Sequence, residues 1–278
     1  MKTIKPSVTL VRITSVALGL SCSPLTGCVT DDDNPMTSPS TNALDNEPAL
    51  HVSGLTPRYD AGLDALIFEI TTNGDAGSIA PTPAGGIDGA PVLGYVFTTT
   101  LNPQDVGFDG VEGTVALAVT SHPDFDDTPL WDEDGDAAYD DDGVVYHAHW
   151  VVLVPDEEAP AGLSVASAPD RIGLPPTAPM PMYLDSPGFT VVEDGSKLRV
   201  LIPLDRVHRR VDFEVGALTA LMRVDASGDV PSLKVERVIS ALEEGAAVVA
   251  IEGAGSAPAS AWPDEAEDNA GFSLEDAG

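Results

Sequence analysis

The segment VVYHAHWVVLV, residues 144–154, decides the fold class. Its residues are mostly β-branched or aromatic, which is typical of a buried β-strand. Successive side chains of a strand point to opposite faces, so His147 and His149 share one face and lie about 6–7 Å apart along the chain. One face is expected to hold Val145, His147, His149, Val151 and Leu153, and the other Tyr146, Ala148, Trp150 and Val152.

Similar short apolar segments recur between glycine, proline and aspartate residues. They lie at residues 64–71, 91–100, 113–121, 162–167, 196–203, 211–224 and 231–240. Only 217–224 and 232–244 also have a spacing compatible with helices. Many strands without alternating helices predict an all-β fold, an antiparallel β-sandwich formed by a single domain.

Composition divides the 278 residues into four parts. Residues 1–27 are predicted to be a signal peptide, because a basic start precedes an apolar run shorter than the about 20 residues that span a membrane. Residues 28–48 are polar and contain prolines, which predicts a flexible tether. Residues 49–252 form the predicted β-sandwich domain, and the acidic tail 253–278 is expected to be disordered.

The leader ends in Leu-Thr-Gly-Cys, residues 25–28. This ending resembles the lipobox of bacterial lipoproteins, in which cleavage after the small residue leaves a lipid-modified cysteine. The resemblance covers only the leader and implies that Cys28 anchors the chain in the cell envelope, outside the cytoplasm. Val29 stands where some lipoproteins carry the aspartate that retains them at the inner membrane, so the outer membrane is expected where an organism has two. The alternative is an ordinary secretory signal with an incidental cysteine.

The two cysteines of the chain, Cys22 and Cys28, both belong to this leader region. Cys22 would be removed with the signal peptide, and Cys28 would carry the lipid. The predicted domain therefore contains no cysteine for a disulfide, a thiolate metal site or a cysteine nucleophile.

Charge limits the partners of the chain. The part after Cys28 holds all 45 acidic residues and 10 of the 13 basic ones, a net charge of 10 − 45 = −35, and no lysine or arginine occurs between Arg58 and Arg171. Such a surface repels nucleic acid and anionic lipid headgroups and attracts cations. A saline habitat would favour the same composition.

Three of the five histidines fall within 28 residues. His122 ends the segment 113–121 and would approach His147 and His149 if that strand pairs with 144–154. Imidazoles from neighbouring strands commonly hold zinc or copper. The alternative is a structural role, with the rings bonded to carboxylates or backbone groups.

A second candidate site is DEDGDAAYDDDG, residues 132–143. Its opening is similar to the first half of an EF-hand calcium loop, but Ala137 and Gly143 replace the glycine and glutamate of that loop, and no flanking helices are predicted. A looser calcium loop is expected, with a solvated loop as the alternative. Its ligands would be Asp132, Asp134 and Asp136 with Asp140 or Asp142.

Met180 and Met182 are also two residues apart, in APMPMYL. Thioethers outside the cytoplasm suit Cu(I), so these residues are candidate auxiliary copper ligands. The alternative is packing at a sheet edge.

Three classes of function fit these features. The first is a lipid-anchored extracytoplasmic protein that binds zinc or copper, the second a surface interaction or structural domain with calcium-ordered loops, and the third a zinc-dependent hydrolase or lyase. The sequence contains no nucleophile elbow, phosphate-binding glycine loop, His-Glu-x-x-His motif or dinucleotide fingerprint. Metal binding therefore ranks above catalysis. No catalytic residue and no protein partner is assigned.

Overall fold

The computed structural model describes residues 43–82, 84, 86–108, 110–122, 145–166, 189–228, 232–242 and 247–252. Strands and four short 3-10 helices form in this part of the chain, and no α-helix occurs in it, which confirms the predicted all-β class. No helix in these ranges is long and apolar enough to cross a membrane. The predicted leader with Cys28, the aspartates of 132–142, the pair Met180 and Met182, and the tail beyond 252 lie outside the described residues.

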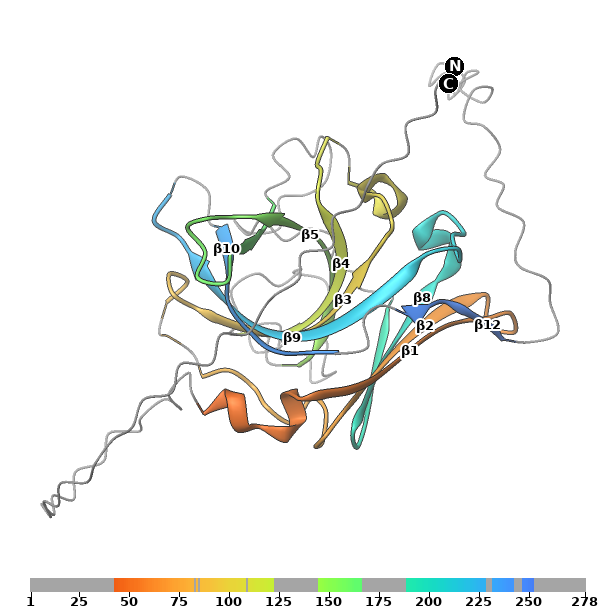
Figure 1. Cartoon of the computed structure of the whole chain (residues 1–278), viewed down its shortest axis with the longest axis horizontal. Coiled ribbons are helices and arrows are strands. Elements are labelled where there is room, and N and C mark those ends of the chain that lie inside the picture. The colour runs from red at the N-terminus through yellow and green to blue at the C-terminus, as the bar shows by residue number, and fades with distance from the viewer. Residues whose placement is uncertain are drawn as a thin grey trace, which may run out of the picture. The chain divides into compact units, whose positions relative to one another are not determined.

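The larger sheet closes on itself into a barrel (Figure 1). Its strand order is β10–β6–β5–β4–β3–β9, and β9 pairs back with β10, so that six antiparallel strands complete the ring. The strands are β3 (Pro91–Thr99), β4 (Thr114–Ser121), β5 (His147–Pro155), β6 (Leu163–Val165), β9 (Glu214–Asp225) and β10 (Ser232–Ala241).

Two features of the strand pairing contribute to the closure. Strand β6 has only three residues, yet its Val165 pairs with Leu153 of β5 on one side and with Leu233 of β10 on the other. The register between β9 and β10 also shifts twice within residues 235–240, and such bulges bend a strand and increase its twist. The predicted antiparallel β-sandwich is therefore corrected, because the larger of the two sheets is a closed barrel.

The second sheet has the strand order β12–β1–β2–β8–β7. Four of its strands are antiparallel, and β12 runs parallel to β1. The strands are β1 (Val52–Asp60), β2 (Ala65–Thr72), β7 (Thr190–Asp194), β8 (Lys197–Pro203) and β12 (Ala250–Glu252). Strand β11 (Ala247–Val248) pairs with β9 of the barrel, so the segment 247–252 hydrogen-bonds to both sheets.

Short 3-10 helices lie outside the strands. η1 (Leu44–Asn46) and η2 (Pro48–Leu50) precede β1, and Leu50 is fully buried. The described part of the chain thus begins inside the stretch predicted to be a tether. η3 (Pro103–Val106) follows β3, and η5 (Leu204–Val207) follows β8.

Strand β5 contributes to two separate cores. Ala148, Trp150 and Val152 pack in the core between the sheets, together with Phe68 of the second sheet. Val151 packs inside the barrel with its neighbour Leu153. The alternation predicted from the sequence is confirmed, and it places His147 and His149 on the face that lines the barrel interior.

Candidate metal site

The three predicted histidines come together where β4 and β5 pair at one end of the barrel. Ala118 lies opposite His149, and Thr120 lies opposite His147. His122 follows the last residue of β4 and continues the alternation that turns Ala118 and Thr120 toward the barrel interior. The pairing expected between segments 113–121 and 144–154 is therefore confirmed.

The imidazoles are close enough to share one ion. One ligand nitrogen from each of His122, His147 and His149 lies within 4.8 Å of the other two. Nε2 of His122 is 3.1 Å from Nε2 of His147. The ring centroids of His147 and His149 are 4.5 Å apart, and those of His122 and His149 are 6.1 Å apart.

These separations are near those of metal ligands. Zinc–nitrogen bonds of about 2.0–2.1 Å at tetrahedral angles place two ligand nitrogens about 3.3 Å apart. The pair His122–His147 already has this spacing, and no pair of these nitrogens has to approach by more than about 1.5 Å. The three imidazole nitrogens therefore lie close to the positions that they would take around a bound zinc ion.

The hydrogen bond of His147 orients its ring for coordination. Nδ1 of His147 lies 2.8 Å from the backbone carbonyl of Val145. Because a carbonyl only accepts, Nδ1 carries the proton and Nε2 is left with its lone pair. In the neutral ring of His147 this lone pair faces Nε2 of His122, which is then the donor of the hydrogen bond between the two rings. When an ion binds, this proton must leave or move to the other nitrogen of His122.

The three rings of the cluster differ in their exposure to solvent. His122 and His149 are 0% and 1% exposed, whereas His147 is partly exposed. Three imidazoles this close repel one another when all are protonated, and neutral rings are the form that binds metal. The cluster is therefore arranged as a set of nitrogen ligands, with His147 as the member that solvent reaches.

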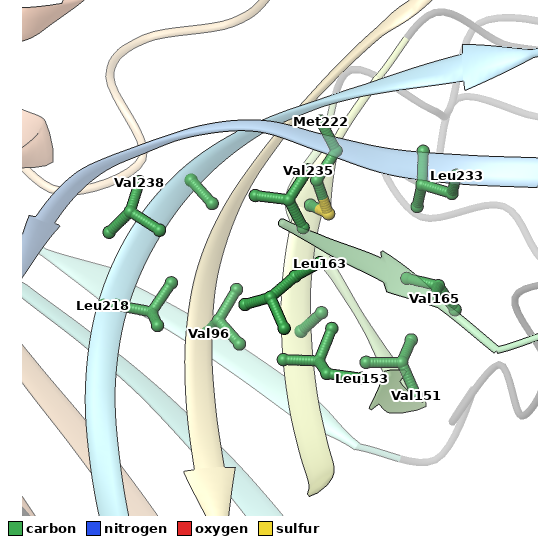
Figure 2. Close-up of a pocket in the computed structure, with 12 residues that line it drawn as sticks. Val96, Val151, Leu153, Leu163, Val165, Leu218, Met222, Leu233, Val235 and Val238 are labelled. Carbon is green, nitrogen blue, oxygen red and sulfur yellow. The ribbon is translucent and has the colours of Figure 1, made fainter. Parts of the chain in front are cut away.

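The barrel interior beyond His149 is apolar. It contains a small cavity of about 20 Å³, room for roughly one water-sized sphere. Figure 2 shows side chains such as Val96, Val151, Leu163 and Val235 pointing toward one another into this space. Ala118, which faces His149, also lines it. The histidines thus form the polar end of an interior that is otherwise filled by aliphatic groups.

Two further residues lie on the same interior face and were not singled out from the sequence. Thr120 is fully buried. Met222 lines the cavity, and its Cε lies 3.1 Å from the place that a Cβ on Gly94 would take. Alternation from Ala118 to His122 is a signal that would have placed Thr120 with the histidines. Met222 depends on the closure of the barrel, which the sequence did not reveal.

The two remaining histidines, which were not predicted as ligands, lie outside this group. His51 Nε2 lies 2.8 Å from the carbonyl of Asp45, and His208 follows η5. The calcium candidates Asp132, Asp134, Asp136, Asp140 and Asp142, the copper candidates Met180 and Met182, and the lipidation candidate Cys28 lie in parts of the chain that the structure does not describe. Those assignments stay predictions.

Comparisons with known proteins found no matching family model, no matching curated protein and no matching solved structure. The interpretation of the site therefore rests on its own geometry and chemistry.

Proposed function

We propose that this chain is a lipid-anchored extracytoplasmic protein that binds one transition-metal ion, zinc or copper, through His122, His147 and His149. The observation that carries the proposal is the convergence of three imidazole nitrogens within 4.8 Å, on rigid neighbouring strands. Strands fix side-chain positions more closely than loops do, which favours selective binding.

The choice of metal follows from the donor atoms. Imidazole nitrogen suits zinc and copper(II), whereas calcium and magnesium prefer oxygen ligands. The high acidic content of the chain adds a long-range attraction for any cation and raises its local concentration. Calcium remains a separate proposal for the aspartates of residues 132–142 and does not involve the histidines.

Binding is favoured over catalysis by the space beside the cluster. A hydrolytic zinc site needs a pocket that admits a substrate next to the ion. Within the described residues, the side of the cluster beyond His149 leads only to an aliphatic cavity of about 20 Å³, which offers a substrate no room on that side. We therefore infer that the protein captures or holds the ion.

The binding proposal is tested by metal analysis of protein stripped with a chelator and dialysed against zinc, copper(II) or calcium. One equivalent of zinc or copper is expected, and it should be lost in the double variant His147→Ala/His149→Ala. The matched control is His51→Ala/His208→Ala, which removes the two histidines outside the cluster and should keep the ion. Equal metal content in both double variants would refute the proposal.

The proposed location rests on the leader sequence, which resembles a lipobox ending in Cys28. The variant Cys28→Ser should move the protein from the membrane pellet to the soluble fraction of the cell envelope. Unchanged fractionation of this variant would contradict lipid anchoring without affecting the metal proposal.

A further inference from the structure

Thr120 occupies the central position of the histidine cluster. It lies directly opposite His147 across the β4–β5 pairing and two residues before His122. His149 lies opposite Ala118 and is therefore the diagonal neighbour of Thr120. Directly opposed side chains have Cβ atoms about 4.5–5.5 Å apart, and diagonal neighbours lie about 7–8 Å apart. An ion held between the three imidazoles would thus lie over Thr120.

The hydroxyl group of Thr120 is buried without a structural role that would explain it. The residue is 0% exposed, and its Oγ1 makes no hydrogen bond to any described residue. Buried hydroxyl groups normally have a partner, because leaving one unsatisfied costs about 1–3 kcal/mol. Thr219, equally buried, shows the usual case: its hydroxyl donates to the carbonyl of Leu50 at 2.6 Å.

The methyl group of Thr120 has a defined neighbour on the other side. Gly94 of β3 pairs with Thr120, and a Cβ added to Gly94 would lie 3.3 Å from Cγ2 of Thr120. The glycine therefore leaves room for this methyl group on the β3 side. With the methyl group accommodated next to β3, the hydroxyl group is free to turn toward the histidines on β5.

We propose that the ion bound by the three histidines keeps a fourth, exchangeable oxygen ligand, water in the resting state, and that Thr120 Oγ1 holds this ligand. The inference rests on the proposed metal binding and goes beyond it. Three nitrogen ligands leave one position of a tetrahedral ion open, and a metal-bound water donates a hydrogen bond that a hydroxyl oxygen accepts. Thr120 is a positioning residue here, because it touches the bound water and does not contact the ion itself.

The test compares Thr120→Val, which replaces the hydroxyl group with a methyl group of similar size, with Thr120→Ser, which keeps the hydroxyl group. Thr120→Val should lower zinc affinity about tenfold, the lower end of what hydrogen-bonding partners of a coordinated group contribute. Thr120→Ser should keep affinity near that of the wild type. In the metal-free protein Thr120→Val should melt at the wild-type temperature or above it, since no internal hydrogen bond is lost.

Thr219→Val is the matched control, because its hydroxyl group bonds within the fold. It should lower the melting temperature of the metal-free protein and leave zinc affinity unchanged. If Thr120→Val instead behaves like Thr219→Val, or if its zinc affinity is within twofold of the wild type, the role of Thr120 is refuted and metal binding by the histidines still stands. If the wild type binds no zinc, the proposed function fails, and this inference fails with it.

Cobalt-substituted protein tests the open position directly. Thiocyanate should change the visible spectrum of the cobalt form by replacing the exchangeable ligand, with weaker binding in Thr120→Val than in Thr120→Ser. An unchanged spectrum at saturating thiocyanate would mean that a protein group fills the fourth position, which overturns the proposal.

Discussion

Two clusters of polar side chains on neighbouring strands differ in how their charges are balanced. On β2 and β8 of the second sheet, Glu69 is 7% exposed and pairs with Lys197 at 2.6 Å and with Arg199 at 2.5 Å. On β4 and β5 of the barrel, three histidines of the same chemical type converge around His147. The first cluster combines opposite charges, whereas the second combines like groups.

The comparison separates two kinds of polar cluster. In the first, the side chains of Glu69, Lys197 and Arg199 balance one another's charges, and in the second, three histidines can bind a metal ion. Burial alone would raise the pKa of Glu69, but hydrogen bonds from Lys197 and Arg199 outweigh it and hold that pKa below its ordinary value. The carboxylate is stable because the chain supplies its counter-charges. The histidine cluster instead brings together nitrogen atoms that can each give a lone pair to a metal cation once they are unprotonated.

The largest effect is expected at the histidine cluster when zinc is present. A ligand at 100 times its dissociation constant stabilises a folded protein by about 2.7 kcal/mol, or roughly 5–10 °C in melting temperature for a domain of this size. The variant His147→Ala/His149→Ala should lose this zinc-dependent shift, whereas Glu69→Gln should keep it. Calorimetry with and without zinc measures both. If the histidine variant keeps the zinc-dependent shift in melting temperature, the histidine cluster does not bind zinc and does not differ from the Glu69 cluster in this respect.

Acid should weaken zinc binding in the next largest effect. A free imidazole is protonated below about pH 6.5, and a protonated ring cannot coordinate. Affinity should therefore fall between pH 7.5 and 5.5, by about tenfold for each imidazole that must lose a proton. Competition titration with a chromophoric chelator measures the slope. Affinity that does not change over this range would point to oxygen ligands in place of the histidines.

Replacing Glu69 with glutamine should lower the free energy of unfolding by about 1–3 kcal/mol, with or without zinc. This loss is smaller than that expected for a fully buried ion pair, because the Lys197 side chain is 42% exposed. The lowered pKa fixes the sign of the pH dependence. The contribution of the Glu69 carboxylate is complete above its ordinary pKa of 4.5 and is lost as pH falls through the lower value of the folded state. Denaturant melts of both proteins should therefore differ at pH 7, and the difference should shrink as the pH is lowered below 4.5. A constant difference would show that packing, not charge, is lost.

The smallest effect is expected at an exposed ion pair. Arg209 donates two hydrogen bonds to Asp64, at 3.0 and 3.1 Å, and the hydrogen bond from Arg209 is the first cause of the lowered pKa of Asp64. The Asp64 side chain is 55% exposed, so solvent screens the pair. Arg209→Ala should lower the melting temperature by at most about 2 °C, less than Glu69→Gln. A fall equal to or larger than that of Glu69→Gln would mean that burial does not explain why the Glu69 cluster contributes more to stability than the Asp64–Arg209 pair.

Much of the fold follows from local patterns in the sequence. All eight predicted strands occur with ends shifted by at most three residues, because β-branched runs between glycine, proline and aspartate are a local signal. Strand β1 was missed because Gly54 and Pro57 interrupt its pattern. Closure of the barrel depends on the three residues of β6 and on bulges between β9 and β10, which are properties of long-range pairing. Those features leave no local signal.

The site was predictable to the extent that it depends on alternation. His147 and His149 share a face because they are two residues apart, and His122 joins them because its strand pairs with theirs. Thr120 has the same periodicity, but a threonine in a strand carries no chemical signal until its burial is known. Met222 reaches the barrel interior only through pairing of β9 with β3, more than 100 residues away in the chain.

X-ray absorption at the zinc edge of the loaded protein tests the central claim most directly. Three histidine ligands with one water predict nitrogen and oxygen scatterers at about 2.0–2.1 Å and the outer-ring scattering of about three imidazoles. The imidazole signal should be absent from His147→Ala/His149→Ala prepared in the same way. A wild-type spectrum with oxygen ligands only, or an imidazole signal that survives in the variant, would contradict metal binding by His122, His147 and His149.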